Sequence, residues 1–164
     1  MMEDISEEIY TPKNMSKYQL AEINIARMKG ININDPVMKE FVDNLDKVNA
    51  LAESSPGFIW RFKDDSNNAT SFNPYNDEQV IINISVWNSI EQLENYMYKT
   101  LHSEFLKRRR EWFHRFGKVY TAMWWIPAGQ FPTVAQAVNN LEYLEKNGAT
   151  EKVFDFKTKF ICPE

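Results

Sequence analysis

The sequence contains very few of the residues that build covalent or metal-held frameworks. Only one cysteine, Cys162, is present among 164 residues, so no disulfide can form within the chain. A lone cysteine suits a reducing compartment, and we expect a cytoplasmic protein. The two histidines, His102 and His114, would point to opposed sides of one helix. We therefore expect no metal site built from protein ligands alone.

Long apolar runs are also lacking. No segment reaches the roughly 18 apolar residues of a membrane span, so we expect no membrane contact. The first residues, MMEDISEEIYTPKNMSK, are acidic and polar, without the basic start and apolar stretch of a secretion signal. We expect residues 1 to 17 to form a flexible leader and residues 18 to 164 to form a single domain.

Several motifs that carry enzyme chemistry are absent. The sequence has no Gly-rich phosphate loop, no G-x-S-x-G, no H-E-x-x-H and no C-x-x-C. Its net charge of −4 argues against non-specific binding to nucleic acid, which needs a basic surface. A hydrophobic content of 43% with 14% aromatic residues indicates a globular protein.

What is present is an alternation of strand and helix patterns. Strands are predicted at residues 18 to 28, 58 to 62, 80 to 87 and 119 to 127, with a last one at 153 to 160. Helices are predicted to begin after the N-caps Asp35, Ser89 and Thr133. The βαββαβ order predicts an α+β, ferredoxin-like fold with an additional C-terminal helix and strand.

Both faces of the predicted sheet are apolar. Trp124 and Trp125 are adjacent in one strand, so their side chains must point to opposite faces. Helices would cover one face, and the second face needs another partner. The simplest partner is a second copy related by a two-fold axis, so we expect a homodimer that forms a dimeric α/β barrel.

The stretch HSEFLKRRREWFHRF, residues 102 to 116, carries an unusual mixture of side chains. On a helical wheel its aromatic residues gather on one side, and the arginine run spreads over the exposed remainder. That distribution predicts a solvated surface and no nucleic-acid site. His102 and Arg109 share the apolar face. The apolar stripe before His102 does not align with the stripe after it, which predicts a break near residues 100 to 102.

Each of these candidate residues has two interpretations. His102 and Arg109 are either a histidine bonded to backbone and a structural ion pair, or a ligand pair. In the second case His102 is an acid, base or axial ligand and Arg109 holds an anionic group. Asn24 and Asn83 lie on apolar strands and need partners from the protein or from a ligand. The tryptophans either pack in the core or line an aromatic pocket; those singled out are Trp60, Trp87, Trp112 and Trp124.

Five segments resemble a bacterial domain family of unknown function in the dimeric α/β-barrel superfamily, which includes antibiotic-biosynthesis and haem-degrading monooxygenases. The segments are LAEINIARMK, DPVMKEFVDNLDKVNALAESSPGFIWRF, INISVWNSIEQLENYMY, HSEFLKRRREWF and WWIPAGQFPTVAQAVNNLEYL. In haem-degrading members a histidine late in the second helix binds iron and an asparagine on the first strand faces the substrate. His102 and Asn24 resemble these two. The tryptophan that distorts the porphyrin is replaced here by Tyr96 and Tyr98, and quinone-forming members use no cofactor.

These observations predict a small-molecule-binding protein of the monooxygenase-like superfamily, with a small hydrophobic, aromatic or porphyrin-like ligand. Its cofactor would be none, or haem held through His102. The alternative is a non-catalytic structural or ligand-binding dimer. The candidate catalytic residues are His102, Arg109 and Asn24, and the candidate substrate-binding residues are Trp60, Asn83, Trp87, Trp112 and Trp124.

Overall fold

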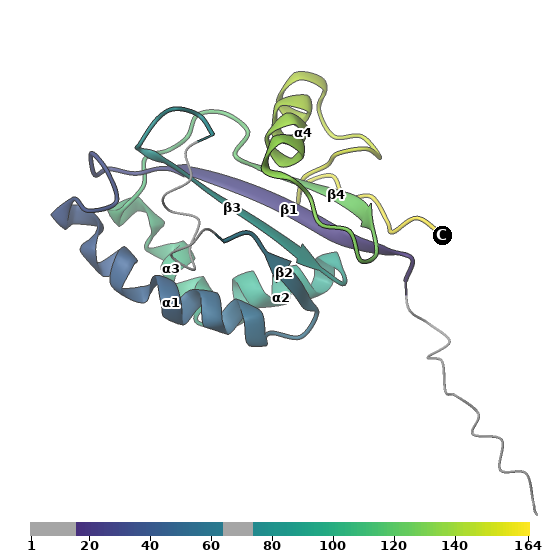
Figure 1. Ribbon diagram of the computed structural model, residues 1–164, viewed down its shortest axis with the longest axis horizontal. Coiled ribbons are helices and arrows are strands. Elements are labelled where there is room, and N and C mark those ends of the chain that lie inside the picture. The colour runs from purple at the N-terminus through teal and green to yellow at the C-terminus, as the bar shows by residue number, and fades with distance from the viewer. Residues whose placement is uncertain (1–15, 64–73) are drawn as a thin grey trace, which may run out of the picture.

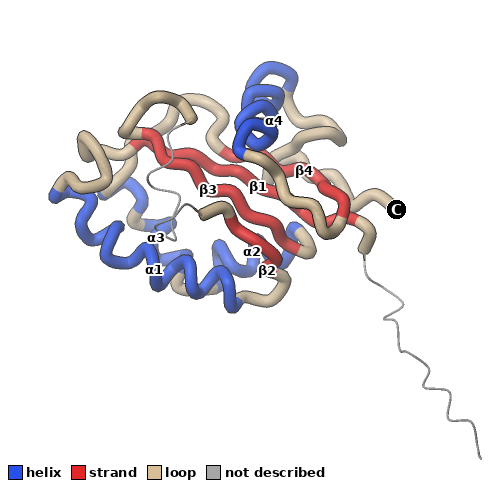
Figure 2. Tube along the Cα trace, viewed as in Figure 1, coloured by secondary structure: helices blue, strands red, loops and turns tan. Residues whose placement is uncertain are grey.

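The computed structural model describes residues 16–63 and 74–164, and its centre is a four-stranded antiparallel sheet (Figures 1 and 2). The predicted leader lies outside the described residues except for Ser16 and Lys17. The strands are β1 (Tyr18–Arg27), β2 (Phe58–Arg61), β3 (Val80–Trp87) and β4 (Thr121–Pro127). The helices are α1 (Lys39–Ser54), α2 (Ile90–Lys99), α3 (His102–Lys107) and α4 (Val134–Asn147), with short 3-10 turns η1 (Pro36–Met38) and η2 (Arg109–Glu111).

The strand order is β2-β3-β1-β4, which confirms the predicted ferredoxin-like arrangement. The central strand β1 pairs with β3 on one side and with β4 on the other. Helix N-termini also follow the predicted caps. The side chain of Asp35 accepts a hydrogen bond from the Val37 amide, and that of Ser89 accepts one from the Gln92 amide. Thr133 forms a complete capping box.

The two faces of the sheet are covered by different helices. α1, α2 and α3 lie on one side and α4 lies on the other (Figure 1). Trp124 packs with the α4 side and Trp125 with the opposite side, as their adjacency predicts. Part of the second face is therefore covered by Ala137, Leu141 and Leu144 of this chain's own α4. Pairing with a second copy is not needed to explain that cover, and it stays a prediction.

The segment 102 to 116 is not one helix. The break predicted near residue 100 is present, because α2 ends at Lys99 and Thr100 has an extended backbone. However, α3 ends at Lys107 after 6 residues, and η2 follows. Beyond η2, Phe113 forms an isolated β-bridge with Met28, next to the end of β1. The backbone at the end of β1 therefore forms the hydrogen bonds that a continued helix would otherwise have made.

The predicted strand at 153 to 160 is also wrong. Phe154 alone pairs with the sheet, exchanging two backbone hydrogen bonds of 2.8 and 2.9 Å with Met123. The carboxylate of Asp155 then accepts hydrogen bonds from the amides of Lys157 and Thr158. These bonds close a turn and direct the chain away from the edge of β4. Among the described residues no helix combines the length and the apolar character that a membrane crossing requires.

Candidate functional site

A cavity of about 470 Å³ lies between the sheet and helices α1 to α3, a size typical of small-molecule sites. Its position follows from the pattern of β1. Leu20 packs in an apolar cluster with Trp87 and Leu93, and Met28 packs in another cluster with Met38 and Trp112. The middle of the strand, between these clusters, presents polar side chains to the cavity. β1 and β3 form the floor, and α1, α2 and α3 form the walls.

Glu22 is the most unusual residue of the floor. Only 3% of it is exposed to solvent, although it carries a carboxyl group. Its Oε1 accepts hydrogen bonds from Asn24 Nδ2 at 2.9 Å and from Thr121 Oγ1 at 3.2 Å. Its Oε2 accepts one from Ser85 Oγ at 3.3 Å, and Ser85 Oγ in turn accepts one from Trp87 Nε1 at 2.9 Å. Within residues 16–63 and 74–164, all donors to the carboxyl group are therefore neutral side chains.

Burial raises the pKa of Glu22 to about 7, and the hydrogen bonds from Asn24, Thr121 and Ser85 only partly oppose this. The charged form is disfavoured because the surroundings solvate it less well than water does. A carboxyl group that titrates near neutrality can release or accept a proton under ordinary conditions. Glu22 is thus the group of the cavity best suited to proton exchange or to pairing with a cation.

His102 lies in the wall, at the start of α3. Its Nδ1 is 3.2 Å from the Met97 carbonyl oxygen, and its ring centroid is 4.8 Å from that of Tyr96. Nδ1 must donate in this bond, so Nε2 keeps a free lone pair in the neutral ring. Burial lowers the pKa of His102, opposed by the hydrogen bond to Met97. The histidine is bonded to backbone, as one interpretation required, and it also lines the cavity.

Arg109 does not point into the interior, and the inward orientation predicted from the helical wheel is wrong. α3 ends before it, and the side chain is exposed at the edge of the cavity. Its only described hydrogen bond, among residues 16–63 and 74–164, runs from Nη1 to the Leu106 carbonyl at 3.4 Å. The guanidinium can therefore meet a ligand group only near the cavity edge.

The asparagines Asn24 and Asn83 both line the cavity and face each other as a register pair of β1 and β3. The tryptophans behave differently. Trp112 lines the cavity, but Trp60 and Trp124 pack on the α4 face, and Trp87 lies in the apolar cluster beside the floor. The predicted tryptophan-lined pocket is therefore wrong in composition, because strand alternation sends Trp60 and Trp124 to the other face. The aromatic lining consists mostly of phenylalanines and tyrosines: Phe41, Phe62, Phe105, Phe113, Phe116, Phe156, Tyr96, Tyr98 and Tyr120.

Three charged residues of the cavity, Glu22, Arg61 and the exposed Arg110, were not among the predicted site residues. Glu22 lies two residues before Asn24 on β1, so both side chains point to the same face of the sheet. This spacing is the signal that could have identified Glu22. Arg61 of β2 is 8% exposed and its Nε donates to Glu53 Oε1 at 2.8 Å. Arg61 is opposite Ser85 in the β2–β3 register, and Ser85 is opposite Glu22 in the β1–β3 register. No group of three His, Cys, Asp or Glu side chains is placed to hold a metal ion within the part of the chain that the structure describes.

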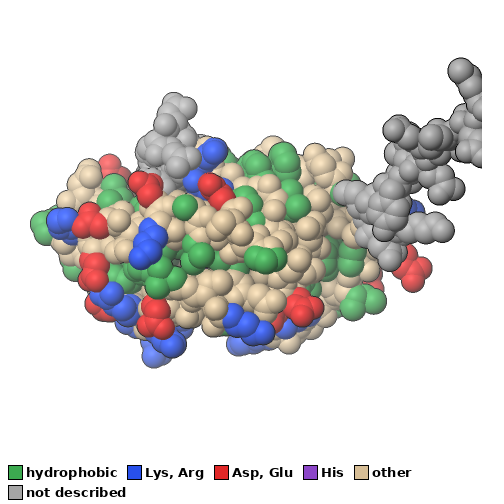
Figure 3. Space-filling model, turned by 90° about the horizontal axis from the view of Figure 1, so that it is seen from below, with side chains coloured by type: hydrophobic (Ala, Val, Ile, Leu, Met, Phe, Trp, Pro, Cys, Tyr) green, Lys and Arg blue, Asp and Glu red, His purple; other side chains and the backbone are tan. Residues whose placement is uncertain are grey.

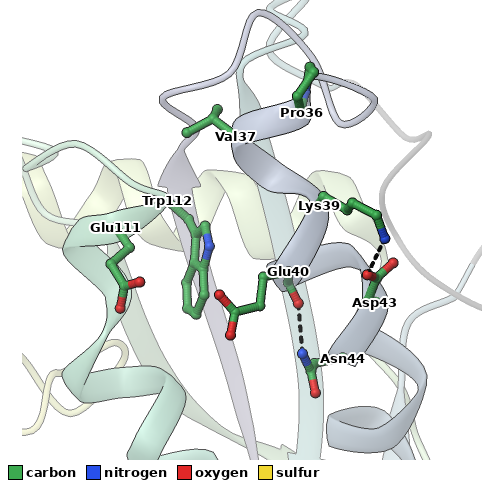
Figure 4. Close-up of a pocket in the computed structure, with 8 residues that line it drawn as sticks. All are labelled: Pro36, Val37, Lys39, Glu40, Asp43, Asn44, Glu111 and Trp112. Carbon is green, nitrogen blue, oxygen red and sulfur yellow. Dashed lines mark hydrogen bonds and ion pairs between the residues drawn. The ribbon is translucent and has the colours of Figure 1, made fainter.

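A second hollow of about 550 Å³ lies on the outside of α1 and η2 (Figure 4). Figure 4 shows the Trp112 ring between the side chains of Glu40 and Glu111. Both carboxylates bind Arg108, at 2.6 Å each, and the Arg108 guanidinium lies 4.9 Å from the centre of the Trp112 ring. This groove is a network of surface ion pairs whose charges already have partners. The internal cavity is therefore the stronger candidate site.

The surface formed by α1, α2 and α3 carries charges of both signs (Figure 3). Lys, Arg, Asp and Glu side chains alternate along this face, with hydrophobic side chains between them. Lys39–Asp43 and Lys107–Glu104 are examples of such neighbours. This mixture differs from the continuous basic surface that nucleic acid requires.

Comparisons with known proteins identify the family and leave the activity open. Two of the solved structures that the chain resembles, both at low sequence identity, illustrate this. One is a protein of unknown function from Nitrosomonas europaea, with 12% identity and a TM-score of 0.46 over 71% of this chain and 97% of that one. The other is SnoaB, a cofactor-independent oxygenase from Streptomyces nogalater, with 13% identity and a TM-score of 0.45 over 69% and 95%.

The search of curated proteins gives no match. The family match is extensive, since it covers residues 19–164 of the chain. It confirms the prediction of a domain family without an assigned activity. The protein belongs to the family described as domain of unknown function DUF3291.

Proposed function

We propose that the protein binds a small aromatic molecule in the cavity between its sheet and helices α1 to α3. The observation that carries this proposal is the cavity itself: it is about 470 Å³ in volume and lined mostly by apolar and aromatic side chains, with polar groups at its floor, in its helical walls and at its edge. Apolar sites with a few placed polar groups are the usual form of small-molecule sites. Asn24 and Asn83 can orient the ligand from the floor, and Arg109 can hold an anionic group at the edge.

Cavity filling tests this proposal. Ala26 lines the cavity, and Ala135 is exposed on α4 on the other side of the sheet, so Ala26→Trp and Ala135→Trp form a matched pair. The probe is the aromatic anion 1-anilinonaphthalene-8-sulfonate, whose fluorescence rises in apolar surroundings. We expect saturable binding in the wild type and in Ala135→Trp, and at least about tenfold weaker binding in Ala26→Trp. Equal binding by all three proteins would overturn the proposal.

Haem binding is a second candidate, favoured by the geometry of His102. Histidines that bind a metal through one ring nitrogen usually donate the other N–H to a carbonyl or carboxylate. The Nδ1 bond to Met97 meets that requirement and leaves Nε2 free. His102 would then hold the iron, Arg109 would meet a propionate, and the haem would supply oxygen chemistry. Haemin added to wild type and His102→Ala should give Soret bands that differ; identical bands in the two proteins would exclude His102 as a ligand.

We also propose that two copies of the chain associate through the α4 side of the sheet. Phe131 is 48% exposed and stacks on Trp60 with ring centroids 5.1 Å apart and an interplanar angle of 6°. Trp60 packs against the same apolar cluster that α4 covers. An exposed aromatic pair beside an apolar cluster is a common feature of contacts between protein chains.

A further inference from the structure

We propose that the ligand of the cavity carries a protonated amine and that Glu22 is its counter-ion. This inference rests on the proposed function and adds the chemical class of the ligand. An aromatic or other hydrocarbon body would fill the apolar part of the cavity. Its ammonium group would lie against the floor, at the carboxylate of Glu22.

The charge of Glu22 is isolated within the described part of the chain. The carboxyl group is buried, and its hydrogen bonds come from the neutral groups of Asn24, Ser85 and Thr121. Among the residues that the structure describes, no lysine, arginine or histidine forms an ion pair with it. A buried carboxylate without an opposite charge is costly, and it becomes favourable when a cation in the same low-dielectric space pairs with it. A cationic ligand would supply that opposite charge.

Among the described residues, the other charged and titratable groups of the cavity form no ion pair with Glu22. Arg61, the basic residue closest in register, is engaged by Glu53. Burial raises the pKa of Tyr96 and lowers that of His102, so neither of these side chains gives a charge to the floor at neutral pH. The remaining titratable side chains that line the cavity come from α2, from η2 and the segment after it, and from the residue before β4. They are Tyr98, Arg109, Arg110, His114 and Tyr120.

The aromatic side chains of the wall also favour an ammonium ligand. An ammonium group is attracted to the face of an aromatic ring, and more strongly when water is excluded. The ring of Tyr96 lines the same cavity as Glu22, and its centroid is 5.1 Å from that of Trp87 and 4.8 Å from that of His102. Burial raises the pKa of Tyr96 most, the charge of Glu22 raises it further, and the charge of Arg61 lowers it. A carboxylate next to aromatic rings is the combination that recognises organic ammonium ions.

Two probes of nearly equal shape test this inference: 2-naphthylmethylamine, which is a cation at neutral pH, and 2-naphthylmethanol, which is not. Binding to the wild type, Glu22→Gln and the control Glu142→Gln would be measured by isothermal titration calorimetry at pH 8. Glu142 is exposed on α4, so its removal takes away the same charge far from the floor. We expect the wild type and Glu142→Gln to prefer the amine by at least about tenfold, and Glu22→Gln to bind both probes equally.

The pH dependence gives a second readout that needs only the wild type. Glu22 must be ionised to pair with the ammonium, and its pKa is about 7. The affinity for the amine should therefore rise about tenfold from pH 6 to pH 8, whereas the affinity for the alcohol should stay constant. This readout decides the question even if Glu22→Gln does not fold.

Each remaining outcome counts against the inference. Equal binding of the two probes by the wild type would overturn it and leave the proposed function intact, because an aromatic ligand would still bind. A preference for the amine that persists in Glu22→Gln would show that another group binds the cation. If neither probe binds while the anilinonaphthalene probe does, the cavity is a ligand site but not an amine site.

Discussion

Ser85 donates its hydroxyl hydrogen to Oε2 of Glu22 across the β1–β3 pair, at 3.3 Å. The direction of this bond is fixed, because the same hydroxyl oxygen accepts a hydrogen bond from the Trp87 indole N–H at 2.9 Å. Ser85 therefore presents its proton to the carboxylate and cannot turn away without leaving the indole unpaired. This chain fixes one oxygen of Glu22, and Asn24 and Thr121 fix the other.

Glu22 should make the stability of the protein depend on pH. Its pKa is about 7 in the folded protein and near 4.5 when unfolded, so the folded state holds the proton more tightly. The resulting stabilisation is complete below pH 4.5 and is lost as the pH rises towards 7. Between pH 5 and pH 8 the free energy of unfolding should fall by about 2–3 kcal/mol more in the wild type than in Glu22→Gln. Urea titrations of both proteins at the two pH values measure this difference.

The comparison with Glu22→Gln removes the contributions of other groups. Asp35, Glu40, Asp77 and Glu111 have lowered pKa values because they accept hydrogen bonds from backbone amides or arginines. Their effects are the same in both proteins and cancel. Parallel pH profiles for the two proteins would show that Glu22 does not titrate near neutrality.

Replacing a tryptophan on either face of the sheet should lower stability, but only the replacement on the cavity side should also weaken ligand binding. Trp124 is 7% exposed and packs with α4, whereas Trp112 is 2% exposed and lines the cavity. Either tryptophan replaced by alanine should lower the free energy of unfolding by about 3–5 kcal/mol. Only Trp112→Ala should also weaken binding of the anilinonaphthalene probe. Fluorescence titration at a temperature where both variants are folded tests this, and weakened binding in Trp124→Ala alone would contradict the assignment of the site.

Arg109 should contribute modestly to the binding of anionic ligands. Its side chain is exposed at the cavity edge, so water and salt screen its charge. Arg109→Gln should weaken binding of the sulfonate probe by about two- to fivefold at low salt, and the difference should disappear at high salt. Arg115→Gln is the matched control, because Arg115 is exposed and does not line the cavity. Equal weakening in both variants would indicate a general charge effect.

Phe131 should matter for association of two copies. If the Phe131–Trp60 pair lies in the contact, Phe131→Ser removes one exposed aromatic ring from it. Sedimentation velocity at micromolar concentration should show a dimer for the wild type and a shift towards monomer for the variant. The control is Tyr98→Ser, since Tyr98 is also an exposed aromatic residue but lies on α2, across the sheet. A monomeric wild type would contradict the proposed association.

Local sequence patterns predicted most of the fold. The strand at 80 to 87 has the same bounds in the structure, and the caps at Asp35, Ser89 and Thr133 form as expected. These features depend on neighbours a few residues apart, which a single sequence displays directly. The break at Thr100 was also visible, because a change in the direction of an apolar stripe is a local property.

The errors arose where segments that are far apart in the sequence compete for the same backbone hydrogen bonds. Nothing between residues 108 and 114 shows that the end of β1 will take over their hydrogen bonds, and nothing near Phe154 shows that only this residue will pair with Met123. Glu22 was missed for a related reason. A charged residue on a strand normally faces solvent, and its burial becomes evident only when α1 and α2 are known to cover that face.

The hydrogen bonds from Lys29 N to the Trp112 carbonyl, at 2.7 Å, and from His114 N to the Arg27 carbonyl, at 2.9 Å, join the end of β1 to the segment beyond η2. β1 and the residues just after it thus carry both the buried Glu22 and the backbone groups that bind residues 112 to 114 of the cavity wall. A ligand too bulky for the cavity would have to break these two backbone hydrogen bonds before residues 112 to 114 could move away from the end of β1.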